Sequence, residues 1–416
     1  MKIILSTVGT SIFDNYLSAK TLFDKRGRRL QTGRRHNDKQ AVDKINRIKK
    51  EAKSSSSISE YRIKDIVEVL NKNWLKSVTK DDDNEWDFKE GLNEFASAEI
   101  ESILKILSSE EDVINVHLIA TDTVLSQLAA EIISSFLNTH FSDRLKAHFN
   151  AKQDVIQDLR IDNYDKFKLG LVRLSDRFYQ IVGNKLVANL SQEVILNITG
   201  GYKAIIPFLS LLGQVNQTKI QYTFEDTGVL IEIPQLPIKQ NDKLFERYWK
   251  ELHRLENEIL NQYEYPELLK DLSICFDLDG NDFCFNFLGN ALWKRFINRY
   301  FLSSCTDEVW KEIEHHGNIQ KEITTNFYSK EHRVKYSVKK PEPYNDHLCY
   351  GKGRHDPRIF YLEDGEEIII YKTFPKHNQN YETYLKKLAD VRLKDLKEHL
   401  IQNTALRKIE LKGRPC

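Results

Sequence analysis

Residues 1–235 alternate short runs of apolar, β-branched residues with longer amphipathic stretches, and this alternation constrains the fold more than any other feature. The short runs predict strands, and stretches such as Asp122–Phe136 and Tyr202–Gln214 predict helices. The alternation favours an α/β domain with a largely parallel, doubly wound, Rossmann-like sheet, in which ligands bind beyond the carboxyl ends of the strands. The predicted strands are Lys2–Ser6, Val116–Ala120, Leu169–Arg173, Glu193–Asn197, Lys219–Phe224 and Val229–Ile233.

The composition narrows the class of protein. Of the 416 residues 40% are hydrophobic and 30% charged, and no apolar run approaches the roughly 20 residues that a membrane span needs. The 62 basic residues nearly balance the 61 acidic ones, which argues against a protein that is basic overall and coats nucleic acid. Five cysteines without a C-x-x-C pair predict reduced thiols and no structural zinc. We expect a cytoplasmic protein without a metal, another cofactor or a membrane segment.

Changes in sequence character divide the chain into three segments. Prolines and polar residues at 234–243 end a first domain, predicted to span residues 1–238. Residues 239–318 are predicted to be a mainly helical coupling segment, including a helix at Ala291–Leu302 and a hairpin turn at Asp277–Asp282. A spacer, a dimerisation unit and a winged-helix module all fit this segment.

The last segment, residues 319–416, is predicted to be a small α+β domain. Lys330–Lys340 and Arg358–Leu362 alternate like antiparallel strands, Glu367–Thr373 follows as a third strand, and a charged helix is expected at Tyr381–Leu400. From Lys321 onward 20 basic residues stand against 14 acidic ones. Positive charge is therefore concentrated at this end of the chain.

A basic insertion interrupts the first domain at about residues 24–60. Between Asp24 and Lys53 it has twelve lysines and arginines against four acids, and a run of serines follows. We expect a solvated helix and a flexible linker, with a contact to nucleic acid or a partner as the alternative.

Two loops that combine glycines with hydroxyl side chains follow predicted strands of the first domain. Glycines let backbone amides approach a ligand closely, hydroxyls donate to phosphate oxygens, and a lysine adds a cation. Neither loop matches the G-x-G-x-x-G or P-loop pattern, so a generic dinucleotide site gains little support. A third strand end adds the hydroxyl of Thr121, with Asp122 as the expected helix N-cap. The ligand-binding residues expected here are Gly9, Thr10, Ser11, Thr121, Thr199, Gly200, Gly201 and Lys203.

The paired loops, Ser6–Ser11 and Asn197–Lys203, resemble those of the CARF domain (CRISPR-associated Rossmann fold) of type III CRISPR effectors. The resemblance covers about residues 1–235. It implies a homodimer that binds a cyclic oligoadenylate, expected to be the tetra-adenylate, across its two-fold axis. Some such domains also cleave their ligand, and the resemblance then points to Ser11 and Lys203.

A cluster rich in cations and poor in carboxylates marks the last domain. RNA cleavage without a metal needs cationic side chains beside the negatively charged phosphorane, which lysine and arginine can supply. It also needs an acid and a base, for which histidine, tyrosine or a lysine can serve. Basic loops of this kind are also common as plain solvated surface. The candidate catalytic residues are Lys352, Arg354, His355, Arg358, Lys376, His377 and Tyr381.

Two common nuclease patterns fit poorly. The Arg-x4-His signature of HEPN ribonucleases is missing; Arg144 and His148 are one residue too close. Asp364 and Glu366 lack the following strand lysine of a PD-(D/E)xK nuclease, and a turn explains them better.

Residues 320–400 instead resemble the RelE/HigB superfamily of ribosome-dependent mRNA interferase toxins. The basis is the strand Arg358–Tyr361, the basic residues just before it, and the stretch from Lys376 to Tyr381 or Tyr384. The resemblance implies that Arg358 and Arg354 stabilise the phosphorane. It also implies that Lys352 or His377 is the general base or acid, with His355 as a further candidate. Tyr381 is then expected to stack on the nucleotide or to orient it.

The two resemblances together predict a CARF–RelE fusion, in which a cyclic oligoadenylate activates an endoribonuclease that cuts mRNA on the ribosome. A DNA-binding regulator that responds to the same ligand is one alternative. A ring nuclease, which degrades the ligand, is another.

Overall fold

The chain divides into two units, residues 1–295 and residues 296–416, each with its own sheet. The computed structural model describes residues 2–18, 22–23, 29–30, 39–52, 70, 96–160, 162–187, 191–224, 228–237, 240–340, 346–365 and 367–411. The division falls earlier than the expected start of the last domain at residue 319. Most of the basic insertion lies outside the described residues, apart from β2 (Leu22–Phe23), β3 (Arg29–Leu30) and α2 (Lys39–Ala52).

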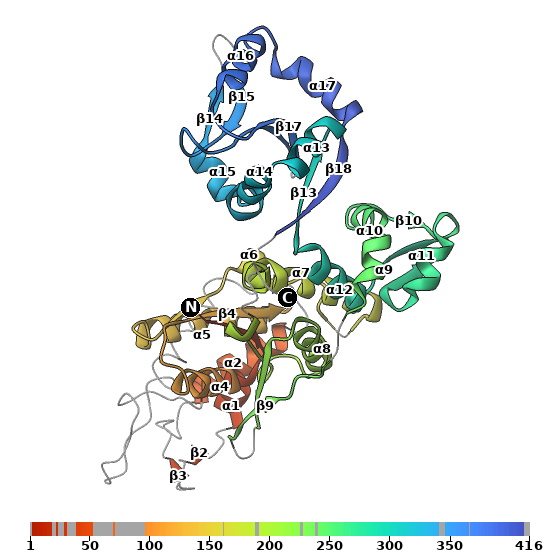
Figure 1. Ribbon diagram of the computed structural model, residues 1–416. Coiled ribbons are helices and arrows are strands. Elements are labelled where there is room, and N and C mark those ends of the chain that lie inside the picture. Colours follow the sequence, from red (N-terminus) through yellow and green to blue (C-terminus); the bar gives the residue numbers. More distant parts are fainter. Residues whose placement is uncertain are drawn as a thin grey trace. The chain divides into compact units, whose positions relative to one another are not determined.

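The first unit is built on a sheet with the strand order β5-β4-β1-β7-β8-β9, and β6 also pairs with β4. Figure 1 labels β4 and β9 of this sheet. All of these pairs are parallel except β8–β9. The α/β class and the largely parallel sheet are thereby confirmed. The strands are β1 (Ile3–Val8), β4 (Ile114–Thr121), β5 (Leu145–His148), β6 (Val155–Ile156), β7 (Val194–Asn197), β8 (Lys219–Thr223) and β9 (Leu230–Ile233).

Helices cover both faces of this sheet because alternate strand residues point to opposite faces. Ile4 of β1 packs in a core with α1, α4 and α5, whereas Ile3 and Leu5 pack in a second core with α7 and α8. The chain leaves β1 toward β4 and returns on the other side at β7, so the switch point lies between β1 and β7. The helices are α1 (Ser11–Ser18), α4 (Ala98–Ser108), α5 (Val124–His140), α6 (Ala151–Asp154), α7 (Tyr164–Val187) and α8 (Ile206–Asn216).

One predicted strand, Leu169–Arg173, is wrong, because these residues lie within α7. The short apolar run is part of a longer helical period: Phe167, Leu171, Leu174 and Phe178 are buried in the core, while Leu169 is 51% exposed.

The middle segment is less helical than expected. Its helices flank a small sheet with the order β10-β12-β11, and Gly280 (φ 61°) turns the predicted hairpin. The helix expected at Ala291–Leu302 ends at Ile297. The elements are α9 (Asp242–Arg247), α10 (Trp249–Leu255), β10 (Leu260–Asn261), α11 (Pro266–Asp271), β11 (Phe276–Asp279), β12 (Asp282–Phe285) and α12 (Phe287–Ile297).

The second unit has a sheet with the order β14-β15-β16-β17-β13-β18. Its pairs are antiparallel except β13–β17, so the sheet is mixed and not purely antiparallel as expected. Because β13 lies between β17 and β18, residues before 319 are central to it. Its strands are β13 (Tyr300–Cys305), β14 (Ser337–Lys340), β15 (His347–Tyr350), β16 (Arg358–Asp364), β17 (Glu367–Phe374) and β18 (Ala405–Glu410).

Two further expectations for this unit need correction. Lys330–Tyr336, expected as part of a strand, forms α15, and only Ser337–Lys340 is extended. The expected single helix at Tyr381–Leu400 is broken into two helices. The helices are α13 (Asp307–His315), α14 (Gly317–Glu322) with a π-helical turn (Ile323–Phe327), α15 (Lys330–Tyr336), α16 (Gln379–Leu388) and α17 (Leu393–Asn403).

A histidine pair in the first unit predicts a loss of stability in acid. His117 on β4 faces His148 on β5 with 4.7 Å between ring centroids. Burial, and then the neighbouring His148, lowers the pKa of His117 from 6.5 to about 4, and burial also lowers that of His148. Between these pH values the unfolded chain binds a proton that the folded chain does not. Stability is therefore complete above pH 6.5 and decreases toward pH 4, by about 1 to 2 kcal/mol for His117 after solvent screening.

The measurement is the melting temperature of the full chain between pH 7.5 and 4.5. His117→Gln should flatten this pH dependence, whereas His399→Gln in the second unit should leave it unchanged. Equal acid sensitivity of the wild type and His117→Gln would contradict the assignment.

Candidate functional site

The two glycine loops of the first unit meet at the carboxyl ends of β1 and β7, at the switch point of the sheet. A Cβ at position 9 would lie 3.1 Å from the backbone of Gly201, so the loops are in direct contact. Thr7 donates its hydroxyl hydrogen to the Gly200 carbonyl (2.8 Å). Gly201 has a φ of 91°, a conformation that favours glycine. The structure thus brings together two loops that the sequence linked only by their composition.

Glu99, which the sequence analysis did not identify, lies between these loops. Its side chain comes from the first turn of α4, and the residue is 1% exposed. One carboxylate oxygen accepts hydrogen bonds from the amides of Gly9 (2.8 Å) and Gly201 (3.2 Å), and the other accepts from the Ser11 hydroxyl (2.5 Å). The only sequence signal was an acidic residue just after the N-cap Ser97, which indicates a favourable helix-dipole interaction and no particular contact.

Two predicted ligand residues, Thr199 and Thr121, are largely buried. Thr199 is 8% exposed; its hydroxyl donates to the Asn197 side chain (2.7 Å) and accepts the amide hydrogen of Thr223 (2.8 Å). Thr121 is 7% exposed at the end of β4. The Thr199 hydroxyl is therefore engaged within the protein, and the Thr121 hydroxyl lies 3.3 Å from that of Thr123.

The helix N-cap after β4 also differs from the prediction. Thr123, not Asp122, caps α5, with its hydroxyl accepting the amide hydrogen of Ser126 (3.3 Å). Asp122 instead accepts the amide hydrogen of Asp158 (3.1 Å).

The more accessible side of the loops carries Thr10 and Lys203. Lys203 is exposed in the turn before α8. The Thr10 hydroxyl donates to Asp14 (2.9 Å), which also pairs with Lys49 of α2. The helix of the basic insertion is thus partly packed, with Ile45 in the core, and it places a cation beside the first loop.

In the second unit, Arg358 and His377 both contact the ring of Tyr381. The Arg358 guanidinium carbon lies 5.8 Å from the centre of this ring, and the His377 ring centroid lies 4.7 Å from it. His377 also pairs with Glu382 (2.7 Å), which fixes the orientation of the imidazole. A cation and an acid/base candidate therefore both contact the same buried tyrosine.

Tyr381 itself is a support and not a surface for a nucleotide. The residue is 3% exposed in an aromatic core, and its hydroxyl lies 3.9 Å from the Cys349 sulfur. Burial raises its pKa, and burial also raises the pKa of Cys349 to about 11, so neither is ionised near neutral pH. The expectation that Tyr381 stacks on a base does not fit this burial.

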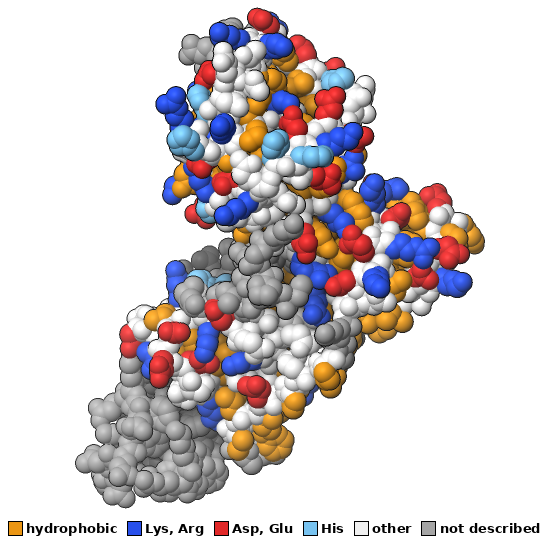
Figure 2. All heavy atoms as spheres, in the orientation of Figure 1, with side chains coloured by type: hydrophobic (Ala, Val, Ile, Leu, Met, Phe, Trp, Pro, Cys, Tyr) orange, Lys and Arg blue, Asp and Glu red, His pale blue; other side chains and the backbone are white. Residues whose placement is uncertain are grey.

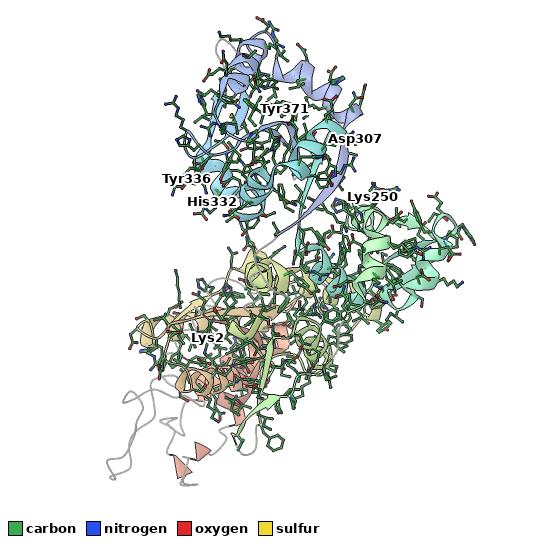
Figure 3. All side chains as sticks on the ribbon, viewed as in Figure 1. Lys2, Lys250, Asp307, His332, Tyr336 and Tyr371 are labelled. Carbon is green, nitrogen blue, oxygen red and sulfur yellow. The ribbon has the colours of Figure 1, made fainter. Side chains whose placement is uncertain are left out.

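Lys352 lies next to this group across Gly351. A Cβ at Gly351 would lie 2.4 Å from the Arg358 guanidinium, so the glycine makes room for that side chain. Lys352 pairs with Glu322 (3.2 Å), which also accepts the Tyr350 hydroxyl hydrogen (2.7 Å). Its ammonium nitrogen lies 5.3 Å from the ring centre of Tyr336. Tyr336, labelled in Figure 3, is the last residue of α15.

The other predicted catalytic residues lie on exposed loops. Arg354 and His355 lie between β15 and β16, and Lys376 follows β17. None of the three has a hydrogen-bond or ion-pair partner within the described part of the chain. Figure 2 shows basic and histidine side chains mixed with acidic and apolar ones on the visible face of this unit.

Within the described ranges, no group of three or more histidine, cysteine, aspartate or glutamate side chains could hold a metal ion. The helices described are too short or too polar to cross a membrane.

A family model described as "CRISPR-associated protein (Cas_APE2256)" matches residues 94–236. The match begins just before α4 and ends after β9, so it includes Glu99 and the second glycine loop. No curated protein matches the sequence significantly. This part of the chain is thus similar to a CRISPR-associated family.

Proposed function

We propose that the chain is a type III CRISPR ancillary effector in which a cyclic oligoadenylate, expected to be the tetra-adenylate, activates an endoribonuclease. The ligand would bind a homodimer of the first unit at the glycine loops. The second unit would then cut mRNA on the ribosome without a metal. The observation that carries the proposal is that two contacting glycine loops lie at the switch point of a sheet in which every strand except β1 falls within the match to a CRISPR-associated family.

The chemistry assigned to the second unit follows from its cations. Arg358 would stabilise the charge that develops on the phosphorane, and Arg354 would add to it from its exposed loop. His377, held by Glu382, would move the proton of the 2′-hydroxyl or of the leaving 5′-oxygen, with Lys352 or His355 as its counterpart. The products would carry a 2′,3′-cyclic phosphate or a 3′-phosphate.

The first test is primer extension on mRNA bound to purified ribosomes, with and without cyclic tetra-adenylate. The same RNA without ribosomes, in EDTA, is the parallel sample. Ligand-dependent cuts confined to ribosome-bound mRNA would support the proposal. Cuts in free RNA would make the second unit a conventional ribonuclease, and no cuts despite ligand binding would contradict the assignment.

A DNA-binding regulator is the weaker candidate. The middle segment has the helices and hairpin that a winged module needs, but its hairpin carries Asp277, Asp279 and Asp282. These carboxylates would repel DNA phosphates. Salt-dependent duplex binding without RNA cleavage would nevertheless favour the regulator, and ligand degradation alone would favour a ring nuclease.

Substitutions at Tyr381 separate a supporting role from a chemical one. Tyr381→Phe keeps the ring that Arg358 and His377 contact, and among the described residues the hydroxyl makes only a long contact with sulfur. We therefore expect cleavage within about threefold of the wild type. Tyr381→Ala should abolish cleavage and destabilise the unit by about 3 to 5 kcal/mol. A large loss of activity in folded Tyr381→Phe would show that the hydroxyl takes part in the reaction.

A further inference from the structure

The carboxylate of Glu99 is held as the glycine loops would hold a phosphate. One of its oxygens bridges the amides of Gly9 and Gly201, which belong to different loops, and the other oxygen takes the hydroxyl of Ser11. No lysine or arginine of the described residues forms an ion pair with it. Among the described residues, backbone amides and a hydroxyl are therefore its hydrogen-bond partners, which is the way such loops bind anions.

The donors around Glu99 have no hydrogen left for a ligand. Each backbone amide carries one hydrogen, and a serine hydroxyl also carries one. The Ser11 oxygen additionally accepts the amide hydrogen of Ala98 (3.2 Å), which directs its own hydrogen to Glu99. Gly9, Ser11 and Gly201, expected as ligand contacts, are thus all engaged within the protein.

Close packing holds the carboxylate in this position. A Cβ at Gly200 would lie 2.3 Å from the Glu99 side chain, so a glycine is needed for the approach. Two turns further along α4, Lys105 contacts the carbonyl of Gly228 and the carboxylate of Glu101. A shift of α4 would therefore also affect the turn between β8 and β9.

We infer that Glu99 is an internal occupant of the anion site, and that a phosphate group of the ligand must displace its carboxylate to reach the glycine loops. The inference deepens the proposed function and depends on it for the identity of the ligand. The structure described here is then the form with low affinity for the ligand, and Glu99 sets the ligand concentration at which the first unit responds. Displacement of the Glu99 carboxylate would break its hydrogen bonds to the two loops and allow α4 to shift. Through Lys105, this shift would move the backbone at Gly228.

The experiment measures binding of inorganic phosphate and of cyclic tetra-adenylate to the full chain by titration calorimetry. Glu99→Gln keeps the shape and an acceptor oxygen but removes the charge, and Glu99→Ala empties the position. Both variants should bind phosphate at least about tenfold more tightly than the wild type. The reason is that the Glu99 carboxylate no longer competes with phosphate for the hydrogens of Gly9, Gly201 and Ser11. Glu101→Gln, on the same helix and paired with Lys105, is the matched control and should match the wild type.

The outcomes separate this inference from the proposed function. Unchanged or weaker phosphate binding by folded Glu99→Gln overturns the inference, and this variant decides the matter if Glu99→Ala does not fold. Tighter phosphate binding with no binding of cyclic tetra-adenylate to any variant supports the inference and contradicts the proposed ligand. Binding of cyclic tetra-adenylate to the wild type, with no gain in either Glu99 variant, contradicts the inference and leaves the proposed function standing.

Discussion

Replacing Arg358 with alanine is expected to lower the rate of ligand-dependent RNA cleavage about 100- to 1,000-fold. One terminal nitrogen of its guanidinium donates to the carbonyls of Asp356 (3.1 Å) and Pro357 (3.4 Å). These bonds and the ring of Tyr381 fix the group, and its other hydrogens, which have no hydrogen-bond partner among the described residues, would bind phosphate oxygens in a defined direction. The loss should appear in kcat, because charge on the phosphorane is greatest in the transition state.

Two further variants sharpen this test. Arg358→Lys keeps the charge without the planar fork and should recover only part of the rate. Arg407→Ala removes an arginine of the same unit, on β18, that pairs with Asp307 of α13. This variant should cleave RNA at the rate of the wild type. Wild-type cleavage by Arg358→Ala would remove Arg358 from the proposed mechanism.

Replacing Gly201 with alanine is expected to abolish binding of cyclic tetra-adenylate and to destabilise the first unit by about 2 to 5 kcal/mol. The left-handed φ of 91° costs a side chain about 1 to 2 kcal/mol. The new Cβ would also lie 2.6 Å from the hydroxyl oxygen of Thr7, a buried residue of β1, which adds about 1 to 3 kcal/mol of overpacking. Relief of this contact would move the second loop away from the first.

Gly280→Ala is the matched control, because Gly280 also has a positive φ (61°) but nothing within 4 Å of a Cβ. It should cost only about 1 kcal/mol and leave ligand binding unchanged. Melting temperature and calorimetric titration are measured for both variants. Equal destabilisation by the two variants would show that the Thr7 contact is easily relieved, and intact binding by Gly201→Ala would argue against a ligand site at these loops.

Local pattern was sufficient for much of the fold. The strands at Lys2–Ser6 and Val116–Ala120 were predicted because β-branched runs bounded by polar turns have few other stable conformations. The same reasoning failed at Leu169–Arg173, where a short apolar run belongs equally to a strand and to one buried turn of a long helix. It also missed β13, whose pairing partners β17 and β18 lie far away in the sequence.

The candidate sites show the same limit. Composition pointed to the glycine loops and to Arg358 and His377, since these residue types suit phosphate chemistry wherever they lie. Composition could not separate Tyr381 as a buried support from a residue that touches substrate, because burial depends on how α16 packs on the sheet.

By itself, the sequence determined the α/β class of the first unit, the residue types at the strand ends and the segregation of positive charge into the last segment. Only the tertiary structure decided that Glu99, about 90 residues from one loop and 100 from the other, takes the hydrogen bonds of both. The reason is physical: hydrogen-bond partners are chosen by proximity after the sheet has formed. An acidic residue in the first turn of a helix has the same local pattern whether it faces water or fills an anion site.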